Sequence, residues 1–158
     1  MKRIFVYGTL MKGQPNHYRL LDEANGAAAF LGSARTIQKF TLVIATKYNT
    51  PFLLNTPCQG RRVQGEIYAV DDRMLKYLDD FERVPTAYQR TLVRLEVKEP
   101  AGEGEGEERL EAGSLTEAYG YTKAPYPGEW LSLPTYERYD SSGDHGLTYV
   151  LRELRDLN

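Results

Sequence analysis

Cysteine and histidine are almost absent from the sequence, which has only Cys58, His17 and His145 among its 158 residues. A single cysteine excludes an intrachain disulfide framework. These three residues match no zinc pattern, and neither histidine lies near a nucleophile elbow, which argues against a serine–histidine–aspartate enzyme. The sequence therefore predicts a protein without a metal ion or another cofactor, and its carboxylates are the natural candidates for acid–base chemistry.

Long apolar runs and an excess of one charge are also lacking. No stretch of about 18 apolar residues is present, so we expect no membrane-spanning helix, and the N-terminal apolar run is too short for a signal peptide. The formal net charge is −2 and no long basic run occurs, which makes nucleic acid a poor partner. With the single cysteine, these features predict a cytoplasmic protein, and no feature demands more than a monomer.

The chain length fits a single domain over residues 1–158. Strands are predicted where apolar residues alternate with polar ones or where β-branched and aromatic types gather, at residues 2–7, 40–46, 52–54, 63–70, 88–97 and 117–122. The strongest helix pattern covers residues 71–82, with Asp71 or Asp72 as the cap and Pro85 as the stop. Weaker helices are predicted at residues 17–23 and 146–158, and the Gly- and Glu-rich residues 99–111 are predicted to form a solvated loop.

This order of elements decides the fold class. Strands do not alternate with helices and glycine-rich phosphate loops, so a doubly wound fold is unsupported. The pattern favours an α+β fold with a small, mostly antiparallel β-barrel or sheet and a helix or two packed on it.

Glu82 is unusual among the carboxylates because of its place on the predicted helix. At 3.6 residues per turn, Leu75, Leu78 and Glu82 fall on one apolar stripe. Burial and the negative end of the helix dipole both raise a carboxylate pKa, which suits a group that takes and returns a proton. The alternative is a Glu at a frayed helix end that turns to water or pairs with Arg83 or Arg90.

A second candidate site follows the first strand, where Tyr7, Gly8, Thr9 and Leu10 form a glycine-containing turn. Glycine at the end of a buried strand lets a ligand approach the backbone closely, and outward N–H groups can hold a carboxylate or a developing oxyanion. The alternative is an ordinary turn that ends a strand.

Several short runs together resemble the γ-glutamyl cyclotransferase family. They are residues 5–10 (FVYGTL), 13–17 (GQPNH), 65–71 (GEIYAVD), 78–82 (LDDFE), 88–90 (YQR), 139–141 (YDS) and 145–147 (HGL). Their order and spacing extend over nearly the whole chain. The runs at 13–17 and near the C-terminus are similar to members of the family that act on γ-glutamyl amines, and residues 102–108 match nothing typical of the family.

The resemblance implies the family's small β-barrel with flanking helices, Glu82 as the acid–base residue, and a loop of Tyr7, Gly8, Thr9 and Leu10 that cradles the γ-glutamyl group. It also implies a reaction without a covalent enzyme intermediate. A γ-glutamyl amine, such as the γ-glutamyl-ε-lysine left from transglutaminase cross-links, would cyclise to 5-oxoproline and release the free amine.

Two other functions remain open at this point. The enzyme could act on γ-glutamyl amino-acid dipeptides or on glutathione instead of γ-glutamyl amines. Alternatively, the same cavity could bind a small metabolite without catalysis, because a fold does not fix a function.

Overall fold

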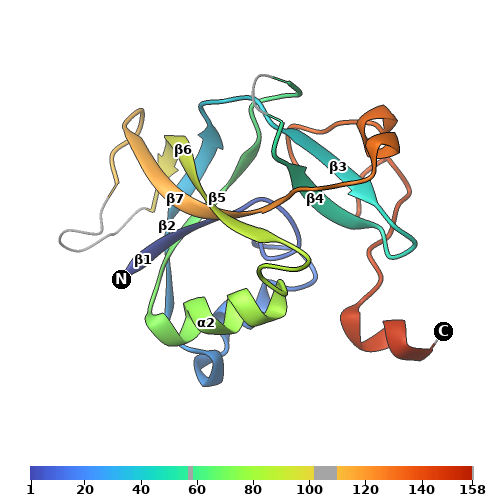
Figure 1. Ribbon diagram of the computed structural model, residues 1–158. Coiled ribbons are helices and arrows are strands. Elements are labelled where there is room, and N and C mark those ends of the chain that lie inside the picture. Colours follow the sequence, from blue (N-terminus) through green and yellow to red (C-terminus); the bar gives the residue numbers. More distant parts are fainter. Residues whose placement is uncertain (57–58, 102–109, 158) are drawn as a thin grey trace.

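The computed structural model describes residues 1–56, 59–101 and 110–157 of the chain (Figure 1). Its seven strands are β1 (Lys2–Val6), β2 (Ala28–Thr36), β3 (Thr41–Ala45), β4 (Thr50–Leu54), β5 (Gln64–Val70), β6 (Gln89–Pro100) and β7 (Leu115–Lys123). The helices are α1 (Tyr18–Leu21) and α2 (Asp72–Phe81), with 3-10 turns η1 (Glu23–Asn25), η3 (Gly128–Ser132) and η4 (Arg152–Leu157).

Five of the strands close into a barrel. They are hydrogen-bonded in the order β1-β5-β2-β6-β7, and β7 returns to pair with β1. Every neighbouring pair in this ring is antiparallel except β1 and β7, which are parallel. The predicted α+β fold with a small, mostly antiparallel barrel is confirmed.

Strand β7 changes partner along one of its edges. Its residues Tyr119 and Gly120 pair with β1, whereas Thr122 and Lys123 pair with β4 of the β3–β4 hairpin. The hairpin therefore extends the sheet away from the barrel, to the right of β7 in Figure 1. The sheet therefore divides along β7, where its pairing with β1 ends and its pairing with β4 begins. We call this place the β1/β4 fork.

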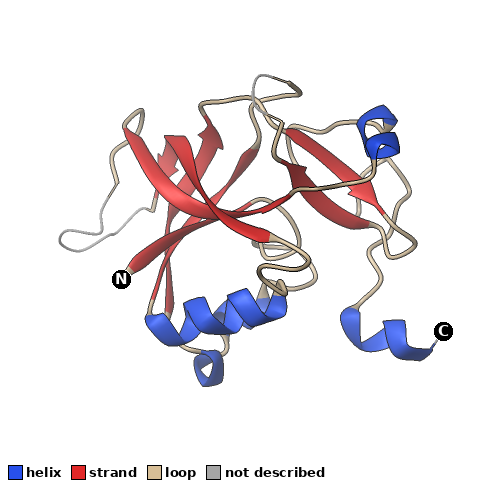
Figure 2. Ribbon diagram, in the orientation of Figure 1, coloured by secondary structure: helices blue, strands red, loops and turns tan. Residues whose placement is uncertain are grey.

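Helix α2 lies across one end of the barrel (Figure 2). The Asp71 side chain caps it by accepting a hydrogen bond from the Met74 N–H at 2.8 Å, as a short polar side chain does for an otherwise unpaired amide. Met74, Leu75 and Leu78 join the hydrophobic core of the barrel. The helix predicted from the apolar stripe is therefore present, and its C-terminal end is fixed against the sheet.

Strand β2 is the main element that the sequence analysis missed. It pairs with β5 on one edge and β6 on the other, and its register shifts between Phe30 and Gly32 and again between Ser33 and Ala34. These irregularities break the two-residue alternation that reveals a strand. The run AAFLGSART also contains few residues with a strong strand preference.

Other predictions need smaller changes. The strand predicted at residues 52–54 begins at Thr50, and β6 runs through to Pro100, so the predicted loop at 99–111 starts later than expected. Residues 102–109 and Cys58 lie outside the described residues. None of the described helices is long and apolar enough to cross a membrane.

Candidate active site

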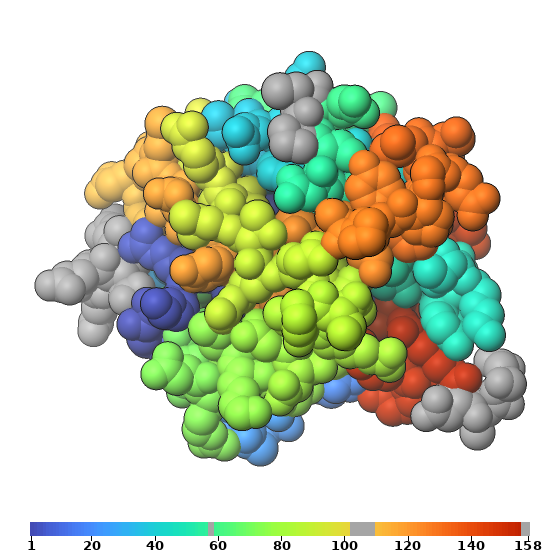
Figure 3. All heavy atoms as spheres, viewed as in Figure 1, coloured from blue at the N-terminus to red at the C-terminus, as the bar shows by residue number. Residues whose placement is uncertain are grey.

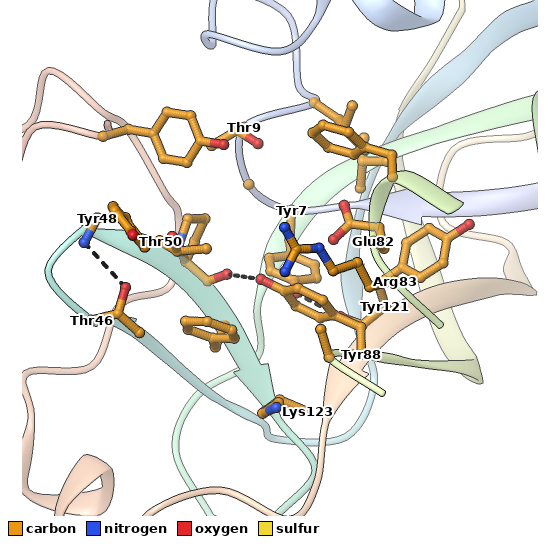
Figure 4. A pocket seen from close by; sticks show the side chains of 18 of the residues that line it. Tyr7, Thr9, Thr46, Tyr48, Thr50, Glu82, Arg83, Tyr88, Tyr121 and Lys123 are labelled. Atoms are coloured by element: carbon orange, nitrogen blue, oxygen red, sulfur yellow. Dashed lines mark hydrogen bonds between the residues drawn. The ribbon is translucent and has the colours of Figure 1, made fainter. Parts of the chain in front are cut away.

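A cavity of about 290 Å³ opens at the β1/β4 fork (Figure 4). Its wall combines the segment that follows β1, the start of β4, the end of α2, and side chains from the C-terminal part of the chain. Tyr7, Gly8, Thr9, Leu10 and Glu82 all line it. The structure therefore brings the five predicted site residues into one cavity, while their roles stay predictions.

The Tyr7 side chain holds the fork in shape. Its hydroxyl donates to the Tyr121 carbonyl of β7 at 2.6 Å and accepts from the Leu53 N–H of β4 at 3.3 Å. One buried hydroxyl thus bridges two strands at the point where their backbone pairing begins. Burial raises the pKa of Tyr7, so the hydroxyl keeps its proton and remains a donor.

The turn after Tyr7 lies beside the cavity and has backbone donors that the described part of the fold does not use. The N–H groups of Gly8, Thr9 and Leu10 form no backbone hydrogen bond within the described residues. A Cβ at Gly8 would lie 2.8 Å from Pro51 Cγ, so glycine allows the turn to approach β4 closely. Neighbouring N–H groups of this kind favour an anion or a developing oxyanion.

Asn16 fixes this turn from behind. Its backbone N–H donates to the Thr9 carbonyl at 2.8 Å, and its side-chain amide donates to Thr9 Oγ1 and Tyr149 Oη at 3.0 Å each. The side-chain oxygen Oδ1 of Asn16 accepts from Arg19 Nε at 3.0 Å. Asn16 is 1% exposed, and it therefore links the turn to α1 and to the C-terminal part of the chain.

Glu82 is presented by the end of α2. It is the residue directly after the helix, and Arg83 adopts the left-handed conformation (φ 53°) that commonly ends one. Figure 4 shows its carboxyl group turned into the cavity. Burial raises the pKa of Glu82 to about 7, against the opposing charges of Arg152 and Arg155.

Glu82 neither turns to water nor pairs with Arg83 or Arg90, as the alternative prediction had it. Arg90 pairs with Asp79 at 3.2 Å instead, and none of the ion pairs between described residues includes Glu82. A carboxyl group with a pKa near neutrality exists in both forms at physiological pH, as acid–base work requires.

Two further tyrosines line the cavity with their hydroxyls engaged. Tyr88 Oη donates to the Pro51 carbonyl at 3.1 Å, and Tyr121 Oη donates to Asp79 Oδ1 at 2.9 Å. Burial raises the pKa of both tyrosines. They therefore form neutral aromatic walls, and Glu82 is the lining group suited to proton transfer near pH 7.

The C-terminal part of the chain supplies lining residues that the sequence analysis did not find, namely Tyr149, Arg152 and Arg155. The sequence predicted only a weak helix here, and η4 covers part of it. No local pattern marks these residues, because they reach the cavity only through the tertiary fold. The sequence marks the two arginines only by their three-residue spacing in a tail rich in charged residues.

The histidines lie outside the cavity wall. His17 Nδ1 donates to the Leu10 carbonyl at 2.9 Å, and His145 Nε2 donates to the Asp140 carbonyl at 2.7 Å. Each histidine therefore fixes a loop through a backbone carbonyl. Across residues 1–56, 59–101 and 110–157, no group of three or more acidic, histidine or cysteine side chains could hold a metal ion.

Comparison with known proteins adds to this geometry. The model of the family described as γ-glutamyl cyclotransferase, AIG2-like, matches residues 4–142. The chain belongs to this family. One relative is γ-glutamylaminecyclotransferase B of Danio rerio, which is 52% identical over 97% of this chain and 75% of its own length. Another is γ-glutamylaminecyclotransferase of Homo sapiens, which is 48% identical over 98% of this chain and 100% of its own length.

Solved structures agree with the fold of this family member. The crystal structure of an AIG2-like protein from Mus musculus superimposes with a TM-score of 0.88 at 48% identity, and covers 97% of each chain. The family match ends at residue 142, so the arginines of the C-terminal part lie beyond it.

Proposed function

We propose that this protein is a γ-glutamylamine cyclotransferase, which converts a γ-glutamyl amine to 5-oxoproline and a free amine. The observation that carries the proposal is the buried Glu82 carboxyl, whose pKa is raised to about 7. It lies in a cavity shared with the N–H groups of Gly8, Thr9 and Leu10, which form no backbone hydrogen bond among the described residues. The names of the relatives support the same activity.

The substrate carries its own nucleophile in this reaction. The α-amino nitrogen attacks the γ-carbonyl carbon and forms the new C–N bond of a five-membered lactam. Glu82 takes a proton from the attacking nitrogen and passes it to the leaving amine as the old C–N bond breaks. The N–H groups of the turn at Gly8–Leu10 would hold the oxygen on which negative charge develops.

An intramolecular attack needs correct positioning more than it needs a protein nucleophile. Tyr88 and Tyr121 line the cavity with neutral aromatic rings. This is consistent with a cofactor-free reaction on a small molecule. The cytoplasmic location predicted from the single cysteine remains part of the proposal.

The test uses the purified protein with γ-glutamyl-ε-lysine, and mass spectrometry of 5-oxoproline and lysine. The native protein should release both in equal amounts, and Glu82→Gln should lower kcat by about 10²–10⁴-fold, the usual contribution of a general acid–base group. Asp80→Asn is the matched control, because Asp80 lies on the same helix with its side chain 72% exposed, and it should keep full activity.

Substantial turnover by Glu82→Gln would contradict the assigned role. Parallel assays with a γ-glutamyl dipeptide and with glutathione separate the proposed substrate from the two related ones. If none of the three substrates reacts, the cavity is that of a binding module.

A further inference from the structure

Residues 148–155, which we call the C-terminal strap, form one side of the cavity. The strap is tied to the β3–β4 turn, because Val150 N–H donates to the Tyr48 carbonyl at 2.9 Å and Asn49 donates to the Thr148 carbonyl at 2.8 Å. In the space-filling view, the red C-terminal part lies between the turn and the end of α2 (Figure 3). The cavity is therefore incomplete without the strap.

The two arginines of the strap differ in what holds them. Arg155 Nε donates to the Val150 carbonyl at 3.1 Å, and its guanidinium lies 4.5 Å from the centre of the Tyr48 ring. The Nη2 atom of Arg155 donates to Thr50 Oγ1 at 3.5 Å. The Arg155 side chain thus makes its contacts within the protein and keeps the strap in place.

Arg152 has a buried donor without a partner. Its Nε is shielded from solvent and forms no hydrogen bond with the described residues. Its guanidinium lies 4.2 Å from the centre of the Phe81 ring, a contact that orients the group but uses none of its N–H donors. An unsatisfied buried donor is costly, and a cavity-lining one is satisfied when an acceptor binds.

The position of Arg152 relative to Glu82 indicates which acceptor fits. Among the nearby charges, Arg152 acts most strongly on the Glu82 carboxyl, although the two form no ion pair. In a γ-glutamyl substrate, the α-amino and α-carboxylate groups share one carbon. If Glu82 receives the amine, the carboxylate must lie next to Glu82, within reach of a neighbouring cation.

We infer that Arg152 binds the α-carboxylate of the γ-glutamyl group, an inference that rests on the proposed function. A guanidinium matches a carboxylate with paired N–H donors. The N–H groups of Gly8, Thr9 and Leu10 are then left for the carbonyl oxygen of the scissile amide. The sequence alone left open which of these two anions the turn holds, and Arg152 assigns the carboxylate elsewhere.

The test compares a γ-glutamyl amine with its analogue that lacks the α-carboxylate, the matching 4-aminobutyryl amide. Arg152→Gln should raise KM for the γ-glutamyl amine about 10–100-fold, the range for a lost charge-assisted hydrogen bond, and change kcat less. At a pH well above the Glu82 midpoint of both proteins, where the Glu82 carboxyl is ionised in each, the native protein and Arg152→Gln should have the same kcat/KM for the 4-aminobutyryl amide within about twofold. Arg152→Lys should recover part of the loss, since it restores the charge without the paired donors.

Arg155→Gln is the matched control, because it removes the same charge from the same strap. It should weaken both substrates equally, through the strap rather than through the carboxylate. Equal losses on both substrates for Arg152→Gln would overturn the inference and leave Arg152 a structural residue.

Product binding keeps this result separate from the test of the proposed function. The affinity for 5-oxoproline, measured by calorimetry, should fall about 10–100-fold in Arg152→Gln and change little in Glu82→Gln. If 5-oxoproline does not bind to the native protein, the proposed function fails. If it binds equally to the native protein and to Arg152→Gln, only the assignment of Arg152 fails.

Discussion

Glu82 owes its chemistry to its surroundings more than to its type. The helix end places it in the cavity wall, burial raises its pKa to about 7, and the charges of Arg152 and Arg155 limit that rise. The apolar stripe of α2 was enough to mark Glu82 from sequence. Its two opposing arginines could not be found in this way, because about 70 residues of chain separate them from the helix.

The pH dependence of kcat/KM should follow the ionisation of Glu82. In the proposed reaction Glu82 acts as a base in the first step, so activity should rise with pH through an apparent pKa near 7, and should be lost below it as the carboxylate is protonated. In Arg152→Gln the midpoint should move upward, since a favourable positive charge is removed. Initial rates from pH 5 to 9 check both statements, and a midpoint near the ordinary Glu value would contradict them.

Tyr7 is predicted to act on stability as well as on the site. Tyr7→Phe leaves the Leu53 N–H and the Tyr121 carbonyl without the hydroxyl that now bridges them. Each unpaired buried group costs about 1–3 kcal/mol, so the free energy of unfolding should fall by about 2–6 kcal/mol for the two groups together. Urea titration measures the free energy of unfolding. Tyr18→Phe is the control, since Tyr18 is 52% exposed. Equal stability of the two variants would refute the bridging role.

At the scale of elements, the site is assembled by connections between segments that are distant in sequence. Asn16 joins the turn after β1 to α1 and to Tyr149 of the strap. The run GQPNH was noted in the sequence for its resemblance to the family. The structural role of this run is visible only in the fold, because the partners of Asn16 are up to 133 residues away in sequence.

Asn16→Ala should therefore disturb two walls of the cavity together. We expect kcat/KM to fall about tenfold or more, and the free energy of unfolding to fall by about 1–3 kcal/mol, because Thr9, Arg19 and Tyr149 lose a buried partner. Steady-state kinetics and thermal melting check the two effects. A variant with native stability and native kinetics would show that the turn and the strap hold their places without Asn16.

The elements that the sequence predicted well are those whose pattern is set by one simple environment. Helix α2 has one apolar face, and β3 is buried along its whole length. Strand β2 was missed because it bends through two register shifts to close the barrel. The sequence did not predict that the strap lines the cavity, because the contacts of the strap are polar and join residues distant in sequence, so no periodicity reveals them.

At the scale of the whole molecule, the barrel closes tightly around Phe5. A Cβ on Gly65 of β5 would overlap the Val6 carbonyl oxygen and lie 2.7 Å from two ring atoms of Phe5. These neighbours are strand backbone and a fully buried ring, so neither can move away easily.

Gly65→Ala should lower the free energy of unfolding by about 1–3 kcal/mol, as overpacked cores do. Gly128→Ala is the matched control, because its Cβ would meet nothing within 4 Å, and it should be neutral. Chemical denaturation of both variants checks the prediction, which fails if Gly65→Ala is as stable as the native protein.

The bridge made by Tyr7 also limits how this cavity can change. A slip of β4 by one residue would turn its side chains to the opposite face and carry the Leu53 N–H away from the Tyr7 hydroxyl that it now meets. The same hydrogen bond therefore favours the observed register of β4, in which Pro51 lies close to Gly8. A change in the size of this cavity is therefore expected to come from exchanged side chains around the opening, because a one-residue slip of β4 would reverse its two faces.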